Sequence, residues 1–145
     1  MLSYWEKESL LHYDYIIIGS GIVGLSAAIS LKELAPASRM LVLERGMLPT
    51  GASTKNAGFA CIGSLTEVLA DLKTMTVTQV TALVDLRRSG LQLLRSRLGD
   101  EVIGYKENGS FELISAREEW ALEQMEEVNE LLAPILEGKP AFTRA

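Results

Sequence analysis

Three glycines with the spacing G-x-G-x-x-G, at Gly19, Gly21 and Gly24, follow one apolar run and open another. In a dinucleotide site the first glycine allows a sharp turn, the second lets a pyrophosphate approach the backbone, and the third lets a helix pack closely on a strand. Ile22 and Val23 then begin a helix whose free N–H groups and partial positive charge favour phosphate. The spacing therefore predicts that these five residues line a phosphate site.

A carboxylate and a guanidinium stand side by side where the ribose of such a nucleotide is expected. Glu44 lies twenty residues after Gly24, a distance at which an acidic side chain can bind both ribose hydroxyls of an adenosine. Arg45 could accommodate the 2′-phosphate of NADP, but Glu44 would repel that phosphate. We therefore assign Glu44 to the adenosine ribose. We keep Arg45 as a neighbouring contact, although a surface arginine beside a turn explains it better.

A strand, a helix and a second strand are needed to position these side chains. The apolar run Tyr15–Ile18 predicts a buried strand, residues 21–34 follow a helical period that Pro36 ends, and residues 39–44 predict a second buried strand. Such a βαβ unit implies parallel strands and a right-handed crossover. The expected fold class is α/β, with a Rossmann-like FAD- or NAD(P)-binding start.

Residues 45–64 are rich in small residues and predict a long loop, a type of segment that often carries function. Four small residues would let the backbone approach a bulky planar ligand: Gly51, Ala52, Ala57 and Gly58. Three polar side chains could bind such a ligand: Ser53, Thr54 and Asn56. On these residues alone, a mobile surface turn explains the segment as well as a binding loop does.

Helices are expected next in the chain. The capping box that Ser64 forms with Glu67 predicts a helix through Leu72, and a longer helical pattern covers residues 77–98 and ends at Gly99. The buried side of the longer helix is expected to comprise Val80, Leu83, Val84, Leu91, Leu94 and Leu98.

The sheet pattern stops after two strands, which leaves edges open and one core face unfilled. The dipeptide Asn108-Gly109, between Tyr105 and Phe111, is the favoured turn of a β-hairpin. Either this hairpin completes the sheet, or the chain is one part of a larger fold.

A last helix is expected from Ser115, which can form a capping box with Glu118, to about Leu132. Its buried side is expected to comprise Trp120, Met125, Val128 and Leu132. Trp120 and Phe111 fit core positions better than a role in stacking on a ligand.

The 145-residue chain has a formal net charge of -5, from 14 Lys and Arg against 19 Asp and Glu. With no basic cluster, nucleic acid is not expected as a partner.

The single cysteine, Cys61, cannot build a disulfide framework and is expected to be buried and inert. No Cys/His cluster predicts a metal site. A cytoplasmic location fits this cysteine usage best. Residues 15–31 are apolar, but their glycines and the acidic residues before them argue against a signal peptide or a membrane span.

Two motifs resemble those of FAD-dependent oxidoreductases of the D-amino-acid oxidase family. They are IIIGSGIVGLSAAISL, residues 16–31, and TGASTKNAGFA, residues 50–60. The branch of the family that includes gamma-glutamylputrescine oxidase is similar in addition at Ser-Tyr-Trp, residues 3–5. The resemblance is specific over about residues 3–63 and only general beyond, and Lys55 stands where close relatives often have Arg.

The resemblance implies an enzyme that binds FAD and oxidises the C–N bond of a small-molecule substrate, an amine or amino acid. It assigns Ser53, together with the three glycines, to the pyrophosphate and Glu44 to the adenosine ribose. It places Asn56, Ala57 and Gly58 beside the ribityl chain and the isoalloxazine.

The resemblance also implies the organisation of the chain. Residues 1–64 would form the N-terminal part of an FAD-binding domain, and residues 65–145 would begin a substrate domain. Since members of this family are considerably longer, we expect an N-terminal fragment with an incomplete fold, which binds FAD weakly or not at all and has no turnover by itself. No catalytic residue is assigned. Two alternatives stay open, an NAD(P)-binding module of another oxidoreductase and a truncated, non-catalytic interaction domain.

Overall fold

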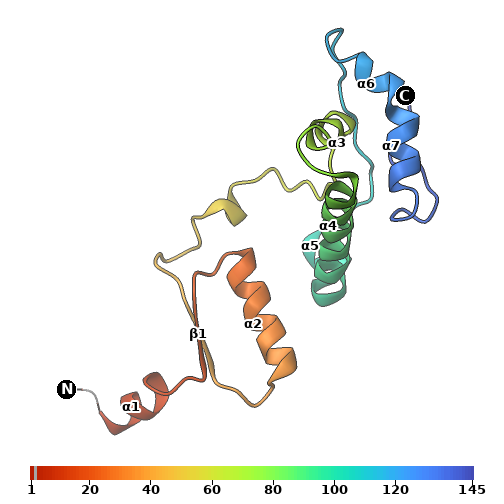
Figure 1. The fold of residues 1–145 in the computed structure, drawn as a ribbon. Helices are drawn as coiled ribbons and strands as arrows, with labels where there is room; N and C mark the ends of the chain where they lie inside the picture. The colour runs from red at the N-terminus through yellow and green to blue at the C-terminus, as the bar shows by residue number, and fades with distance from the viewer. Residues whose placement is uncertain (2) are drawn as a thin grey trace. The chain divides into compact units, whose positions relative to one another are not determined.

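The computed structural model describes residue 1 and residues 3–145, and it contains two compact units, Met1–Phe59 and Ala60–Ala145 (Figure 1). We call them the first unit and the second unit. None of the helices in the described part of the chain has both the length and the apolar character needed to cross a membrane.

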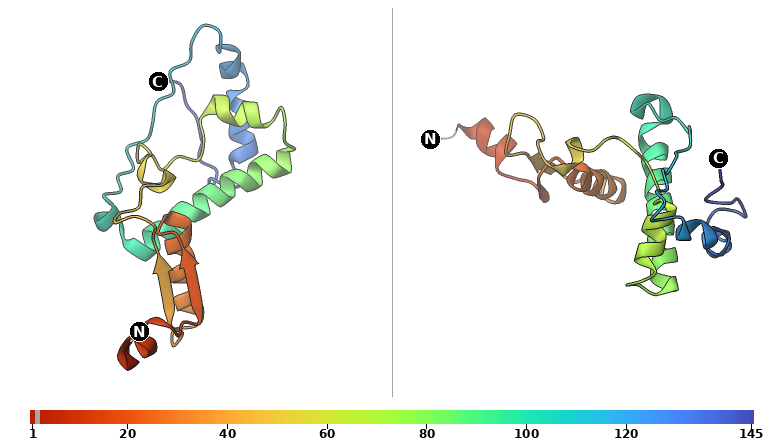
Figure 2. Two further views of the ribbon diagram at one scale, coloured as in Figure 1. Left: turned by 90° about the vertical axis from the view of Figure 1, so that its left-hand side faces the viewer. Right: turned by 90° about the horizontal axis from the view of Figure 1, so that it is seen from above.

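The first unit is a βαβ element preceded by a short helix. Its elements, in chain order, are α1 (Tyr4–Leu10), β1 (Tyr15–Ile18), α2 (Ile22–Leu34), β2 (Met40–Leu43) and the short 3₁₀ helix η1 (Ala52–Thr54). The two strands run parallel, as the left view of Figure 2 shows, and they pair in register from Tyr15 opposite Met40 to Ile18 opposite Leu43. The predicted strand–helix–strand order and the parallel pairing are confirmed.

Helix α2 ends where the sequence predicts. Ala35 is its C-terminal cap residue and has left the helical conformation, with φ -134° and ψ 73°. This follows because the next residue is Pro36, and the ring of a proline disfavours the helical conformation in the residue before it.

The strands of the first unit are not buried. Ile17 faces α2, because its Cγ2 lies 3.4 Å from the position that a Cβ atom on Gly24 would take. Ile16 and Ile18 alternate onto the opposite face and are 57% and 87% exposed. The prediction of two buried strands is therefore wrong for this chain. One helix covers one face of a two-stranded sheet, and no second layer within the described residues of the first unit covers the other face.

The second unit is built from helices around one core. Its helices are α3 (Leu65–Asp71), α4 (Val77–Leu98), α5 (Asp100–Ile103), α6 (Trp120–Glu123) and α7 (Met125–Leu132). The buried apolar side chains come from α3, α4, α6 and α7: Leu65, Val68, Leu69, Val80, Val84, Ala121, Met125, Val128 and Leu132. Four helices therefore share a single hydrophobic cluster.

The predicted start of α3 and both predicted ends of α4 are confirmed, while α3 ends at Asp71, one residue before the predicted end. Ser64 and Glu67 form the reciprocal capping box of α3, and the helix over residues 77–98 has the predicted bounds. Gly99 ends α4 with a φ of +82°, a conformation that suits glycine. A further capping box, between Thr76 and Gln79, begins α4 and was not predicted.

The predicted hairpin is wrong, since no strand is present among the described residues 99–119. In its place, Glu112 reaches the start of α3, where its carboxylate accepts the N–H of Leu65 at 2.9 Å and the hydroxyl of Thr66. This segment is thus held by a contact to a helix terminus, which takes the place of cross-strand pairing. Phe111, expected in the core, is 84% exposed.

The predicted last helix is shorter than expected and interrupted. Ser115 donates its N–H and its hydroxyl to Glu118, but regular helix begins only at Trp120 and breaks at Gln124. Trp120 is 38% exposed and lies under the ammonium group of Lys73, which is 4.6 Å from the ring centroid. The core positions predicted for Trp120 and Phe111 are therefore wrong.

Two more burial predictions are wrong. Leu98, expected on the buried side of α4, is 42% exposed, because the second unit packs other elements against the first half of that helix, where Val80 and Val84 lie. Cys61 is exposed, because it stands in an irregular segment before α3 and belongs to no helix that could bury it.

Candidate functional site

The turn from β1 into α2, residues 19–24, has a geometry that requires two of its glycines. We call it the glycine turn. Gly19 has a φ of +100°, and its N–H donates to the carbonyl of Leu43 at 2.7 Å. A Cβ atom on Gly24 would lie 2.1 Å from the carbonyl oxygen of Gly19, a distance that no side chain tolerates. Gly19 thus makes the sharp turn, and Gly24 allows the close approach of helix to strand.

Ser53 meets the start of α2 beside Gly21. The N–H of Ile22 donates to Ser53 Oγ at 2.9 Å, and a Cβ atom on Gly21 would lie 3.1 Å from the same oxygen. Gly21 stands at the N-terminal cap position and has no side chain to cap the helix. The hydroxyl from η1 therefore caps α2 in its place, 31 residues further along the chain.

Two further N–H groups at the start of α2 have no acceptor among the described residues. The N–H groups of the first three helical residues, Ile22, Val23 and Gly24, lack acceptors within the helix, because Leu25 is the first residue here to donate back, to Gly21. Ile22 donates to Ser53, which leaves Val23 and Gly24. Because the helix dipole adds about half a positive charge at this end, an anion is the natural acceptor.

The Glu44 carboxylate lies at the same edge of the sheet and is held from three sides. Its Oε2 accepts the N–H of Ser20 at 3.0 Å and the hydroxyl of Ser20 at 2.8 Å, and its Oε1 accepts the N–H of Gly46 at 3.2 Å. These hydrogen bonds, those of Ser20 foremost, lower the pKa of Glu44 from 4.5 to about 2. The side chain is therefore a fixed, fully ionised hydrogen-bond acceptor at neutral pH.

Ser20 is the residue of this site that the sequence analysis missed. The strand register pairs Ile18 with Leu43, so Ser20 and Glu44 both follow the ends of neighbouring parallel strands. The Ser20 hydroxyl and the Glu44 carboxylate therefore both lie just beyond the carboxyl ends of the paired strands, within hydrogen-bond distance of each other. The parallel pairing was itself predicted, and it was the signal from which this contact could have been inferred.

The remaining predicted contacts lie in the loop after β2. The side chain of Asn56 folds back onto its own loop, donating to the carbonyl of Ser53 at 3.1 Å and accepting the N–H of Gly58 at 3.0 Å. Gly58 has a φ of +76°, which explains a glycine at this position. Ala57 is exposed, and so is Arg45, whose backbone N–H contributes to the low pKa of Glu44.

The structure thus separates the predicted residues into two groups. Seven of them gather around the start of α2: Gly19, Gly21, Ile22, Val23, Gly24, Glu44 and Ser53. Asn56 and Gly58 shape the loop that carries Ser53, while Ala57 and Arg45 are exposed beside these residues. No cluster of metal-ligating side chains occurs in the described part of the chain.

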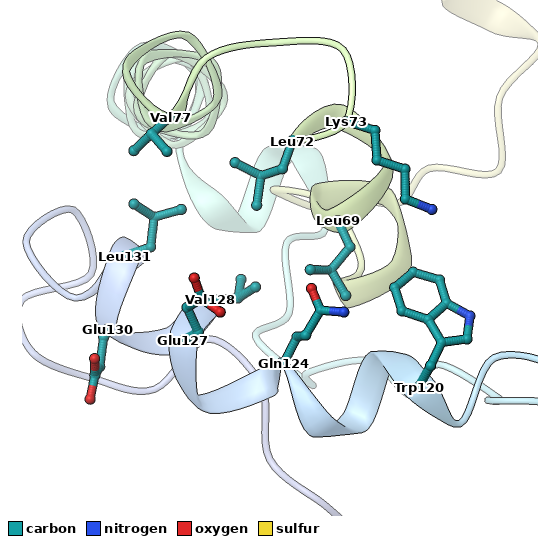
Figure 3. Close-up of a pocket in the computed structure, with 10 residues that line it drawn as sticks. All are labelled: Leu69, Leu72, Lys73, Val77, Trp120, Gln124, Glu127, Val128, Glu130 and Leu131. Atoms are coloured by element: carbon teal, nitrogen blue, oxygen red, sulfur yellow. The ribbon is translucent and has the colours of Figure 1, made fainter.

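The second unit has a groove of about 560 Å³ between α3 and the helices α6 and α7 (Figure 3). Its walls are mainly apolar, with Leu69, Leu72 and Val128 inside it. The ammonium of Lys73 is already paired with the ring of Trp120 at one end. The groove is large enough for a small ligand, but its polar groups do not converge on one point as those of a specific site do. The glycine turn therefore remains the candidate site.

Two comparisons with known proteins found similar sequences. The sequence model of a family described as FAD dependent oxidoreductase matches residues 14–143. A protein from Synechococcus sp. (strain RCC307), described as a probable malate:quinone oxidoreductase, is 45% identical over 49 residues, which are 32% of this chain and 10% of that protein. The match therefore spans only a tenth of the length of that relative. No solved structure matches the chain.

Proposed function

The chain belongs to the FAD-dependent oxidoreductase family, and from this premise we propose that it is the N-terminal, FAD-binding portion of an enzyme that oxidises the C–N bond of an amine or amino acid. The cofactor of the family is FAD, which decides between FAD and NAD(P) as the dinucleotide. The family is one of oxidoreductases, so a non-catalytic origin of the fold is disfavoured.

The observation that carries the proposal is the start of α2, where two N–H groups have no acceptor among the described residues, beside an ionised carboxylate. FAD has a pyrophosphate, which needs donors, and an adenosine ribose, which needs an acceptor. The N–H groups of Val23 and Gly24 are such donors, and Glu44 is such an acceptor. The lack of a side chain at Gly21 leaves the backbone accessible next to them. The chemistry of the residues present therefore fits the group.

We assign the residues accordingly. The glycine turn, with Ile22, Val23 and Ser53, would hold the pyrophosphate, and Glu44 the ribose. The loop of Asn56, Ala57 and Gly58 would lie along the ribityl chain and the isoalloxazine, with Arg45 at the edge of the nucleotide. When bound, FAD supplies the redox chemistry of such an enzyme, because its ring system accepts a hydride equivalent from the substrate.

In this proposal the first 64 residues belong to the FAD-binding domain and the rest begins a substrate domain. The placement in the branch that includes gamma-glutamylputrescine oxidase rests on the Ser-Tyr-Trp start and on the motif over residues 50–60. No residue of this chain is assigned to the reacting bond.

A second candidate reaction is the oxidation of a hydroxy acid with a quinone as the electron acceptor. It is supported by the local similarity to the probable malate:quinone oxidoreductase, at 45% identity over 49 residues. Both candidates share the FAD site and differ in whether the oxidised bond is C–N or C–O.

The FAD assignment is tested by adding FAD to the isotope-labelled chain and recording amide chemical shifts, which also detect weak binding. We expect the signals of the glycine turn and of residues 44–46 to move, while riboflavin, which lacks the phosphates and the adenosine, leaves them in place. Unmoved glycine-turn signals at millimolar FAD would contradict the assignment.

The reaction is tested on the protein purified from its own source, at whatever length it has there. The FAD-loaded protein is mixed without oxygen with a set of amines and amino acids and, separately, with hydroxy acids including malate. Loss of the visible flavin absorbance with the first set supports C–N oxidation, and loss with the second set alone supports the other candidate.

A further inference from the structure

We propose that Ser20 is a positioning residue of the nucleotide site: it holds one oxygen of the Glu44 carboxylate and thereby presents the other oxygen to a single hydroxyl of the adenosine ribose. This inference rests on the proposed function, because it takes Glu44 as the ribose ligand.

The geometry singles out one carboxylate oxygen. Both donors of Ser20 converge on Glu44 Oε2, the N–H at 3.0 Å and the hydroxyl at 2.8 Å. Glu44 Oε1 receives the N–H of Gly46, at 3.2 Å, and the N–H of Arg45 adds the weakest of the interactions that lower the pKa of this carboxylate. Hydrogen bonds to an ionised acceptor are stronger than those between neutral groups. Ser20 makes two of these three bonds, and both are shorter than the bond from Gly46, so Ser20 is the residue that mainly fixes this side chain.

Counting acceptor positions gives the consequence for the ribose. A carboxylate oxygen accepts about two hydrogen bonds. The two donors of Ser20 fill both positions on Oε2, whereas Gly46 leaves one position open on Oε1. Glu44 can therefore accept one ribose hydroxyl while Ser20 stays bound. This replaces the expectation from sequence that Glu44 accepts both hydroxyls.

Positioning matters here because Glu44 is exposed. A free glutamate side chain has several rotamers, and fixing it on ligand binding costs conformational entropy. Ser20 fixes it before the nucleotide arrives, so that this cost is not taken from the binding free energy. Without the hydroxyl of Ser20, Glu44 keeps its charge and the hydrogen bonds from the N–H groups of Ser20 and Gly46. It loses the shortest of its three hydrogen bonds, and its orientation is less firmly fixed.

The test measures FAD affinity of the full chain by amide chemical-shift titration, with Ser20→Ala, Ser20→Thr and the matched control Ser26→Ala, a serine on α2 away from Glu44. We expect Ser20→Ala to weaken FAD binding about tenfold, which corresponds to about 1.4 kcal/mol. Ser20→Thr, which keeps a hydroxyl, restores most of the affinity, and Ser26→Ala leaves it unchanged. In a Glu44→Ala background, Ser20→Ala has no further effect.

A second readout needs no ligand. The carboxyl signal of Glu44 is titrated in the wild type and in Ser20→Ala, and its midpoint is expected to rise towards the ordinary glutamate value in the variant.

An unmoved midpoint overturns the hydrogen bond from Ser20 to Glu44, and wild-type FAD affinity in Ser20→Ala overturns the positioning role. A loss that persists in full in the Glu44→Ala background means that Ser20 acts by another route and overturns the proposal as well. If the glycine-turn signals of the unaltered chain do not move at millimolar FAD, the assignment of the nucleotide site fails first and this inference fails with it.

Discussion

At the residue scale, the glycine turn depends on contacts of two different kinds. The space beside Gly24 is closed by backbone, the carbonyl oxygen of Gly19, whereas the space beside Gly21 is closed by the hydroxyl of Ser53. A backbone atom in a turn between a strand and a helix has little freedom to move, while a serine hydroxyl can rotate away. The two glycines should therefore tolerate substitution differently.

Gly24→Ala is expected to displace α2 from β1, because the new Cβ would lie 2.1 Å from a backbone oxygen. Overpacking of this kind costs about 1–3 kcal/mol. Gly21→Ala is the matched control, with a contact of 3.1 Å to a movable hydroxyl. Amide spectra of the two variants check this: the β1 and β2 signals should be lost in Gly24→Ala and kept in Gly21→Ala. Equal damage in both would contradict the contacts described.

The Glu44 carboxylate gives a pH dependence with a defined sign. Its pKa is lowered from 4.5 to about 2 by hydrogen bonds that exist only in the folded chain. A group with a depressed pKa stabilises the fold above its unfolded pKa, and the contribution disappears as the pH falls through the folded pKa. We therefore expect the glycine turn to loosen between about pH 4.5 and pH 2, as seen in the amide signals of Ser20 and Gly46. The variant Glu44→Gln should show no transition in that range.

At the scale of elements, the starts of α3 and α4 in the second unit are fixed by side-chain caps. The Ser64 hydroxyl accepts the N–H of Glu67 at the start of α3, a helix whose buried residues form part of the core. Ser64→Ala is expected to lower the free energy of unfolding by about 1 kcal/mol. Denaturant unfolding followed by circular dichroism measures this. The control is the exposed Ser89→Ala inside α4, which should not lower the free energy of unfolding, because alanine has the higher helix propensity. A neutral Ser64→Ala would mean that Glu112 alone suffices to cap α3.

The end of the chain is attached to α7 by one buried amide. Asn129, 8% exposed, donates to the carbonyl of Phe142 and accepts its N–H, both at 2.9 Å. Asn129→Ala leaves both backbone groups without partners, and we expect a loss of about 2 kcal/mol in unfolding free energy. The same unfolding experiment tests it, with the exposed Glu130→Ala on the same helix as the control. A loss no larger than that of the control would show that water replaces the amide.

The sequence-based predictions succeeded where a structure depends on neighbouring residues and failed where it depends on contacts between residues far apart in the chain. The helix over residues 77–98 and the capping box at Ser64 are local patterns, and the structure has them at the predicted positions. The hairpin at Asn108-Gly109 also looked local, but it needs partners across the turn, and Glu112 is instead bound at α3, 47 residues away from Leu65. Burial of Phe111, Trp120 and Cys61 depends on what packs over them, which no local pattern contains.

The same distinction applies to the candidate site. Spacing alone predicted the turn at Gly19, the close approach at Gly24 and a carboxylate at Glu44 at the same sheet edge. The role of Ser20 was not predicted, because G-x-G-x-x-G does not specify the residue at this position and the contact joins residues 24 apart. The parallel pairing of β1 with β2 brings Ser20 and Glu44 together.

At the scale of the whole molecule, the two units differ in what stabilises them. The second unit has a core from four helices, whereas no side chain of β1, α2 or β2 is buried. Burial of apolar side chains is the main favourable contribution to folding, and backbone hydrogen bonds exposed to water contribute little net stability. The candidate nucleotide site therefore lies on the less stable unit, and a ligand that binds its folded form should stabilise it.

Hydrogen exchange tests this difference in stability. Without ligand, amides of α3, α4 and α7 are expected to exchange at least about tenfold more slowly than those of β1, β2 and α2. The reason is that the amides of the first unit are exposed when the βαβ element opens, and this element has no buried side chain to resist opening. Added FAD should slow exchange at β1 and α2 and leave the second unit unchanged, since binding lowers the population of the open form in proportion to ligand concentration over Kd. Riboflavin is the control, because it has no phosphate to bind the glycine turn and no adenosine to bind Glu44.

Equal protection of both units without ligand would contradict the stability difference. Slowing confined to the second unit with FAD would instead move the nucleotide site away from the glycine turn.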